Sequence, residues 1–117
     1  MTLPFPLPED LAELIARRFR LLGDATRIRI LDQLRHGEAT GTQLAASVGT
    51  TQQNVSKHLG ILAEAGIVVR RRQGNFSYYH VADDGIWDLC HHVCGDVERR
   101  LEEIRTLLHA PSEREVA

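Results

Sequence analysis

The sequence predicts a mainly α-helical fold with one small β-hairpin, in the order α-α-α-α-β-β-α, which is typical of a winged helix-turn-helix. Three observations indicate it. A short amphipathic segment ends at Gly49, and a second helical segment with a polar side follows from Thr51. Two β-branched or aromatic runs, IVVRRR and FSYYHV, then flank the turn QGN. Finally, a long stretch from Asp83 keeps apolar residues at helical spacing.

The first part of the chain predicts two amphipathic helices. Three prolines discourage regular structure in residues 1–8, which we expect to form a flexible segment before a helix over 9–22. Gly23 ends that helix, and Asp24 is a favourable N-cap for a second helix that ends at Gly37. Apolar residues recur three and four positions apart and predict the buried faces: Leu11, Leu14, Ile15, Phe19 and Leu22, then Ile28, Leu31 and Leu34.

The helix-turn-helix itself is predicted over residues 40–66. Thr40 or Thr42 caps a short third helix, Gly49 allows a tight turn, and a fourth helix runs from Thr51 to about Ala65. Such a helix fits the major groove of DNA, where amide side chains pair with adenine and lysine reaches guanine or phosphate. Its predicted exposed side supplies these candidate DNA-binding residues: Thr51, Gln52, Gln53, Asn54, Ser56, Lys57 and His58.

The predicted hairpin carries three consecutive arginines. Arg70 and Arg72 share one face of the strand because side chains alternate, and Arg71 points to the other face. With Asn75 in the turn, they are candidate contacts for phosphates or the minor groove. The alternative is that the arginines only protect an exposed edge strand against aggregation.

The charge distribution favours a local polyanion-binding surface. The net charge is −2, but residues 40–82 carry four basic residues against one acid, a net +3. Residues 83–117 carry four basic residues against nine acids, a net −5, and residues 1–39 are balanced. Because phosphate binding needs only a local positive patch, the middle of the chain is the predicted DNA-facing part.

Composition indicates an ordinary globular domain, with 43% hydrophobic and 26% charged residues. We expect one domain over 9–109 and a frayed tail over 110–117. No apolar run reaches the length of a membrane span, and the start lacks a signal-peptide pattern, so we expect no membrane association and a cytoplasmic location. No nucleophile with its base, paired acids or glycine-rich phosphate loop stands out, which argues against an enzyme.

Three stretches resemble the ArsR/SmtB family of winged-helix repressors: RFRLLGDATRIRILDQL, QLAASVGTTQQNVSKHLGILAEAGIV and RRRQGNFSYYHV. The resemblance covers roughly residues 9–108, and LGDATRIRIL and the run NVSKHL are its most specific parts. It implies a DNA-reading helix over 51–62 and a wing over 69–80. It also implies a homodimer paired through the first and last helices, and release of DNA when a metal ion binds.

The metal-binding patterns best known in that family are absent from this sequence. The stretch GEATGTQLA has no cysteine where the family's thiolate site lies. The zinc-type pattern on the last helix maps to Asp83, Gly85, Asp96 and Arg99, of which only Asp83 matches. Two carboxylates alone make a poor transition-metal site.

A different candidate sensor lies in the run CHHVC. Cys90, His91 and Cys94 converge on one side of a helix, and two such sets meet across a dimer axis. Thiolate and imidazole suit Ni, Zn, Co, Cd or Cu(I), and sulfur alone suits As(III). Alternatively, the two cysteines respond to oxidants or persulfide, or are small hydrophobes in a helix interface. A site that uses Glu9, Asp10 or Glu13 also remains open.

The predicted function is a homodimeric, DNA-binding transcription factor. One recognition helix covers few base pairs, so specific affinity needs a palindromic operator in double-stranded DNA with two half-sites. The alternatives are a constitutive regulator, one assisted by a partner protein, or a winged helix that binds a protein instead of DNA. Steep salt dependence and loss of affinity on changing Lys57 or Arg70 to Ala distinguish DNA binding from the last of these.

Overall fold

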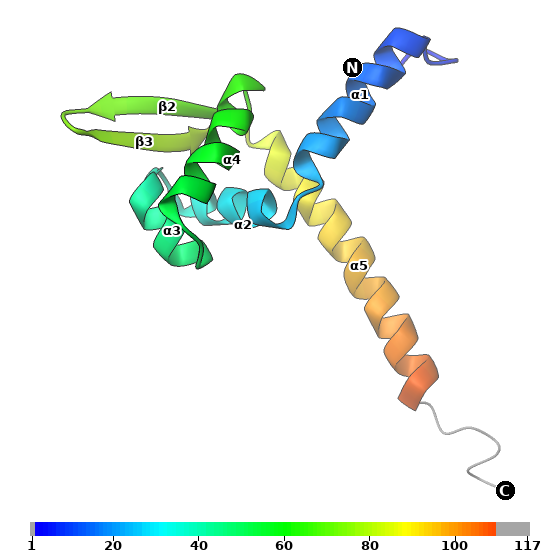
Figure 1. Cartoon of the computed structure of the whole chain (residues 1–117). Helices are drawn as coiled ribbons and strands as arrows, with labels where there is room; N and C mark the ends of the chain where they lie inside the picture. Colours follow the sequence, from blue (N-terminus) through cyan, green and yellow to red (C-terminus); the bar gives the residue numbers. More distant parts are fainter. Residues whose placement is uncertain (1, 110–117) are drawn as a thin grey trace, which may run out of the picture. The chain divides into compact units, whose positions relative to one another are not determined.

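The computed structural model describes residues 2–109 and shows the predicted order of helices and strands (Figure 1). The chain divides into two compact units, residues 1–83 and 84–117. The first unit contains every element from α1 to β3, and the second contains α5. The predicted frayed tail, 110–117, lies outside the described residues. Within the described residues, no helix is both long and apolar enough to cross a membrane.

The first two helices begin and end close to their predicted positions. Helix α1 spans Glu9–Leu22, and α2 spans Ala25–Gln33 before a single 3-10 turn over Leu34–His36. The Asp24 carboxylate accepts a hydrogen bond from the backbone N–H of Arg27 at 3.0 Å, as expected of an N-cap.

The helix-turn-helix is confirmed. Helix α3 spans Gly41–Val48, and Thr40, not Thr42, is its N-cap, in a reciprocal capping box with Gln43. Gly49 then takes φ 77° and ψ 39°, a left-handed conformation that glycine adopts without steric cost. Helix α4 spans Gln52–Glu64 behind the N-cap Thr51.

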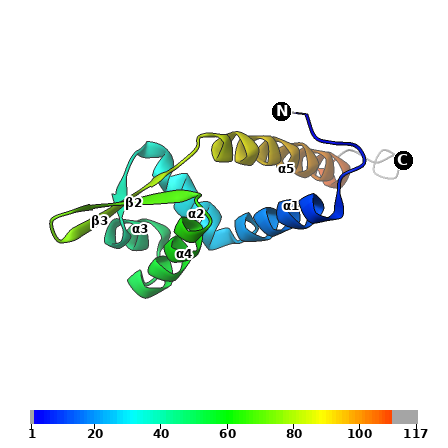
Figure 2. The ribbon, with the colours of Figure 1, turned by 90° about the horizontal axis from the view of Figure 1, so that it is seen from above.

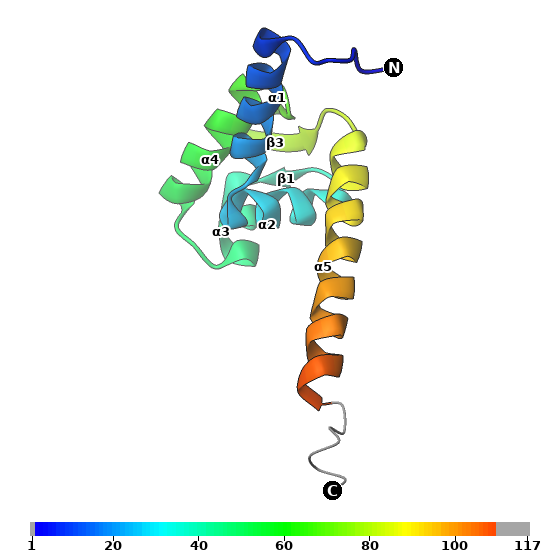
Figure 3. The ribbon, with the colours of Figure 1, turned by 90° about the vertical axis from the view of Figure 1, so that its right-hand side faces the viewer.

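The predicted hairpin is present, and a third strand joins it. Strands β2, Val68–Gln73, and β3, Phe76–Val81, pair antiparallel around a tight turn in which Gly74 takes φ 61°. The two-residue strand β1, Ala39–Thr40, was not predicted; it pairs with β3 and makes the sheet order β1-β3-β2 (Figure 3). The tip of the β2–β3 hairpin extends past α3 and α4 (Figure 2).

The core of the first unit lies where α2, α3, α4 and the base of the sheet meet. Its fully or nearly buried apolar side chains come from each of these elements: Leu22, Ile30, Leu31, Leu34, Leu44, Ala45, Val48, Val55, Leu59, Leu62, Ile67 and Val68. Close packing of such side chains is the main stabilising contribution, about 1.5–3 kcal/mol for each large one.

Two predicted buried faces are wrong in detail. Ile28 is 45% exposed, and Ile30 is buried in its place, because α2 packs on α3 and α4 through the side that carries residues 30, 31 and 34. In α1, Leu22 is buried, whereas Leu14 and Phe19 are more than half exposed. Leu11 and Ile15 are half-buried, so the apolar face of α1 is only partly covered in one chain.

The second unit consists of one long helix, α5, which spans Gly85–His109. None of its described residues is buried. The sequence predicted an apolar stripe along this helix, and its first members, Ile86, Leu89 and Cys90, are half-buried. The later members are exposed over about half or more of their surface: Val93, Val97, Leu101, Ile104 and Leu108.

Candidate nucleic-acid interface

The start of α4 presents a polar surface on the side opposite the core. Two of its amides are already oriented by neighbours: Gln52 donates to the hydroxyl of Thr42, and Asn54 Nδ2 donates to Thr50 Oγ1 at 3.1 Å. The Thr51 hydroxyl accepts the Asn54 backbone N–H at 3.0 Å and so fixes the first turn. Asn54 is half-buried, and the other predicted DNA-binding residues of this surface are exposed: Thr51, Gln52, Gln53, Ser56 and Lys57.

His58 does not belong to that surface. Its side chain is only 7% exposed, because position 58 lies between Val55 and Leu62 on the core side of α4. Its Nδ1 accepts a hydrogen bond of 3.0 Å from Arg27 Nε, and Arg27 Nη1 donates to the carbonyl of Leu21, also at 3.0 Å. The prediction of an exposed His58 was therefore wrong, and the residue links α4 to the junction of α1 and α2.

The three hairpin arginines have different surroundings. All three are exposed, as is Asn75 in the turn. Arg70 Nε donates to Ser77 Oγ at 3.0 Å, which holds the side chain along the sheet. Across residues 2–109, the side chain of Arg72 makes neither a hydrogen bond nor an ion pair. The guanidinium of Arg71, in contrast, is hydrogen-bonded to two other side chains.

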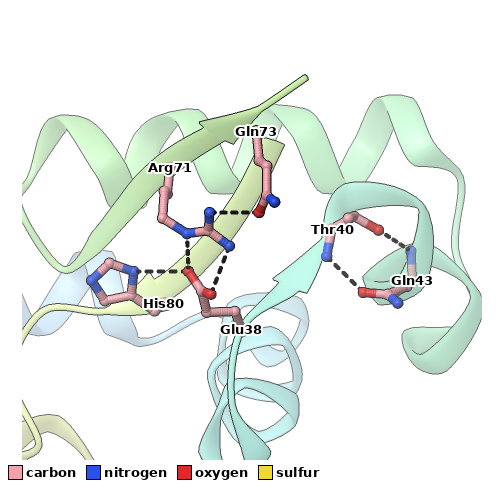
Figure 4. A network of polar contacts seen from close by, with 6 residues as sticks. All are labelled: Glu38, Thr40, Gln43, Arg71, Gln73 and His80. Carbon is pink, nitrogen blue, oxygen red and sulfur yellow. Dashed lines mark hydrogen bonds and ion pairs between the residues drawn. The ribbon is translucent and has the colours of Figure 1, made fainter. Parts of the chain in front are cut away.

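Arg71 forms a polar network with Glu38 (Figure 4). Its Nε and Nη2 donate to the two carboxylate oxygens of Glu38, each at 2.9 Å, and Nη1 donates to Gln73 Oε1 at 2.8 Å. These hydrogen bonds lower the pKa of Glu38 and raise the pKa of Arg71. Nδ1 of His80 lies 3.7 Å from Glu38 Oε2.

Nothing in the local sequence pattern indicated this network. Glu38 and Arg71 are 33 residues apart, and they meet because Glu38 directly precedes the short strand β1. A two-residue strand leaves no periodicity to detect. The hydrogen bond between Arg27 and His58, which are 31 residues apart, was missed for the same reason.

The predicted sensor residues all lie near the start of α5. Cys90 is half-buried, Cys94 and His91 are exposed, and both cysteines are free thiols. Among the described residues of one chain, no group of three or more His, Cys, Asp or Glu side chains is arranged to hold a metal ion. The donor types suit a soft transition metal, but one chain does not assemble the site.

Comparison with known proteins identifies the family. Residues 22–71 match a family model described as a helix-turn-helix domain. The HTH-type transcriptional regulator KmtR of Mycobacterium tuberculosis is 37% identical over 86 residues, 74% of this chain and 66% of KmtR, just under two thirds of that protein. A second curated regulator of that species, the uncharacterized Rv0081, is 39% identical over 82 residues, 69% of this chain and 72% of Rv0081.

Solved structures of helix-turn-helix regulators are also similar to this chain. The crystal structure of Rv0081 superposes with a TM-score of 0.75 at 34% identity, covering 82% of this chain and 97% of that one. A homodimeric winged helix-turn-helix domain of Mycobacterium bovis, described as a possible ArsR-family transcriptional regulator, gives a TM-score of 0.70 at 28% identity and covers 86% and 95% of the two chains. The chain belongs to the ArsR/SmtB family.

Members of the ArsR/SmtB family are helix-turn-helix transcriptional regulators and not enzymes. A further ArsR/SmtB structure, the antimony-specific transcriptional repressor AntR, has a TM-score of 0.75 at 29% identity and covers 85% of this chain and 90% of AntR. The match to the family model begins at Leu22 and ends at Arg71, so it includes the whole helix-turn-helix and the first half of β2.

Proposed function

We propose that this protein is a sequence-specific transcriptional regulator that binds a palindromic operator in double-stranded DNA as a homodimer. The exposed polar surface at the start of α4 carries the proposal. Gln53 and Lys57 lie opposite the buried apolar face of a helix that follows the Gly49 turn, and Gln52 is exposed in its first turn. The helix is therefore held by its buried face while its polar side stays exposed for reading bases.

The wing adds a second, sequence-independent contact. Arg70 and Arg72 lie on the same face of β2 and are both exposed, so their guanidinium groups can reach phosphates or the minor groove. Positive charge is thus concentrated in the helix-turn-helix and wing, although the chain as a whole has a net charge of −2.

The exposed apolar stripes support a homodimer. Leu14 and Phe19 in α1 and the stripe of α5 are uncovered within one chain, and exposed apolar surface of this extent marks an interaction site. The M. bovis domain of the same fold is homodimeric. A second copy of this chain covers both stripes and places two recognition helices for two half-sites.

Selection from a random duplex pool followed by fluorescence anisotropy tests DNA binding. Lys57→Ala is expected to weaken binding about tenfold and to flatten the salt dependence, whereas Gln53→Ala weakens binding only to the selected sequence. Arg35→Ala is the matched control, because Arg35 is an exposed cation paired with Asp32 outside the proposed interface. Absence of any salt-dependent DNA binding by the wild-type protein would reject this function in favour of a protein-interaction module.

We further propose that the regulator responds to a transition metal such as Ni, Zn, Co or Cd, bound by Cys90, His91 and Cys94 from two chains. The support is the chemistry of these donors and their spacing of one helical turn on α5. A relative of the same fold, AntR, is antimony-specific. The cytoplasm, where the reduced thiols persist and DNA is available, is the proposed location.

Calorimetric titration of the reduced, metal-free protein with Ni(II), Zn(II), Co(II) and Cd(II) tests the sensor. Stoichiometric binding is expected, and changing Cys90 and Cys94 together to Ser should abolish it. Binding that survives this change would place the site on other ligands, with Glu9, Asp10 and Glu13 the first candidates. No binding at all would leave thiol oxidation or constitutive regulation, which DNA binding before and after oxidation separates.

A further inference from the structure

The strand register brings four polar or aromatic residues to one face of the wing sheet. Arg71 lies opposite Tyr78 across the β2–β3 pair, and Ala39 lies opposite Tyr79 across the β1–β3 pair. Extending that register by one residue places Glu38 opposite His80, two positions from Tyr78 on the same face. Figure 4 shows three of these residues, Glu38, Arg71 and His80, side by side on the sheet.

Each of the three nitrogens of the Arg71 guanidinium makes a hydrogen bond on this face. The guanidinium makes two parallel hydrogen bonds of 2.9 Å to the carboxylate of Glu38 and a third, of 2.8 Å, to Gln73. Its central carbon lies 4.9 Å from the centre of the Tyr78 ring. A bidentate arginine–carboxylate pair is specific in geometry, and one that also stacks on an aromatic ring is strongly positioned.

The neighbouring arginines differ in both direction and partners. Arg70 and Arg72 point to the opposite face of β2, since side chains alternate along a strand. Arg70 donates one hydrogen bond, to the neutral hydroxyl of Ser77, and neither residue pairs with a carboxylate within residues 2–109. Their charge is therefore available to an incoming phosphate, whereas the charge of Arg71 is neutralised by Glu38.

We propose that Arg71 is a positioning residue and not a DNA contact: with Glu38 and Tyr78 it ties the hairpin to the segment before α3, so that Arg70 and Arg72 meet the phosphates. The tie joins the wing to the chain that leads directly into the helix-turn-helix, because Glu38 lies two residues before Thr40, the N-cap of α3. The orientation of the wing relative to the recognition helix is thereby fixed. The phosphate contacts of Arg70 and Arg72 rest on the proposed function, whereas the link between Glu38 and Arg71 does not depend on it.

Hydrogen exchange of the DNA-free protein tests the tie directly. Glu38→Gln keeps the shape of the side chain and removes its charge, so amide exchange in residues 68–81 should become about two- to fivefold faster. Arg71→Gln should give at least the same change, because it also removes the contacts to Gln73 and Tyr78. The double variant should exchange no faster than Arg71→Gln alone, because the Glu38–Arg71 pair is already lost in that variant. Arg72→Gln, the matched control, should leave the exchange near wild type, because the side chain of Arg72 makes no hydrogen bond or ion pair within residues 2–109. Unchanged exchange in Glu38→Gln would reject the proposal that the Glu38–Arg71 pair holds the hairpin to the segment before α3.

DNA binding tests which of the three arginines contact phosphates. With a fluorescein-labelled 30-base-pair duplex of random sequence as probe, affinity is measured over a range of salt concentration. Arg72→Gln and Arg70→Gln should each reduce the slope of log K against log salt by about 1 per protomer, and Arg71→Gln should leave it unchanged. The opposite result, a flatter slope in Arg71→Gln with a steeper one in Glu38→Gln, would make Arg71 a phosphate contact that Glu38 restrains, and would overturn the proposal.

The DNA-binding and hydrogen-exchange experiments test separate parts of the proposal, so one part can be rejected without the other. If the wild-type protein does not bind the duplex, the proposed function is rejected together with the DNA-contact roles of Arg70 and Arg72. The exchange experiment requires no DNA, so it still decides whether Glu38 and Arg71 hold the hairpin. Circular dichroism of each variant confirms that the helices are retained.

Discussion

Helices α4 and α5 have apolar stripes of the same periodicity, but their surroundings differ. In α4, Val55, Leu59 and Leu62 are at most 1% exposed, because α2, α3 and β2 cover them. In α5, no described residue is buried, and Leu101 is 54% exposed. A helical apolar stripe predicts that a face will be covered, but it does not say whether the same chain or a second chain covers it.

This difference assigns a separate task to each helix. The covered stripe of α4 contributes to the stability of the folded chain, and leaves the polar side of α4 available to DNA. The uncovered stripe of α5 contributes to association in the proposed dimer. Substitutions in the two stripes should therefore change two different equilibria, unfolding and dimer dissociation.

The largest expected effect is on folding, from Leu59→Ala in α4. Leu59 is 1% exposed, so truncation removes buried contacts and leaves a cavity. We expect the free energy of unfolding to fall by about 2–5 kcal/mol in urea denaturation at fixed protein concentration. Ser56→Ala on the exposed side of the same helix is the control and should change it by less than about 0.5 kcal/mol. Equal effects of the two changes would remove the distinction between the faces of α4.

The next effect is on association, from Leu101→Glu in α5. A carboxylate in the middle of an apolar stripe must be desolvated when a second copy covers it. We expect the dimer dissociation constant from sedimentation equilibrium to rise by tenfold or more, about 1.4 kcal/mol. Glu103→Gln lies on the opposite side of the helix by its 3.6-residue period and should leave dissociation unchanged. A wild-type protein that is monomeric at micromolar concentration would contradict the proposal that a second chain covers the α5 stripe.

The smallest effect concerns acid sensitivity, which we expect in the winged unit and not in the α5 stripe. The hydrogen bond from the Arg27 backbone N–H lowers the pKa of Asp24 below its ordinary value of 3.8. The folded state therefore holds this proton less tightly than the unfolded state. Stabilisation by Asp24 is fully present above that ordinary pKa and is lost as pH falls through the lowered value.

Asp24→Asn separates the charge from the cap, because Asn is an equally good N-cap. At pH 7 the unfolding free energy should stay within about 1 kcal/mol of wild type. Below about pH 4, the stability of the variant should fall less steeply than that of wild type in denaturation followed across pH. Identical pH profiles would show that the Asp24 charge contributes nothing.

Local sequence patterns predicted every element except the short strand β1, and most of the exposed polar side of α4. Asp24 and Thr51 cap helices because their side chains accept backbone N–H groups a few residues away, and Gly49 allows the left-handed turn. The start of α4 is polar opposite an apolar face, and the spacing predicted the exposed residues correctly except for the buried His58 and the half-buried Asn54. Each of these features depends on neighbours within one or two helical turns.

The sequence by itself therefore determined the order, the boundaries and the caps of the helices, together with the hairpin and its turn, since these depend on short-range hydrogen bonds and periodicity. Tertiary structure decided which side of α2 is buried, why His58 turns inward to Arg27, and how Glu38 meets Arg71. Those contacts join residues more than 30 positions apart. Only the packing of whole elements brings such residues within hydrogen-bonding distance, and no local pattern encodes it.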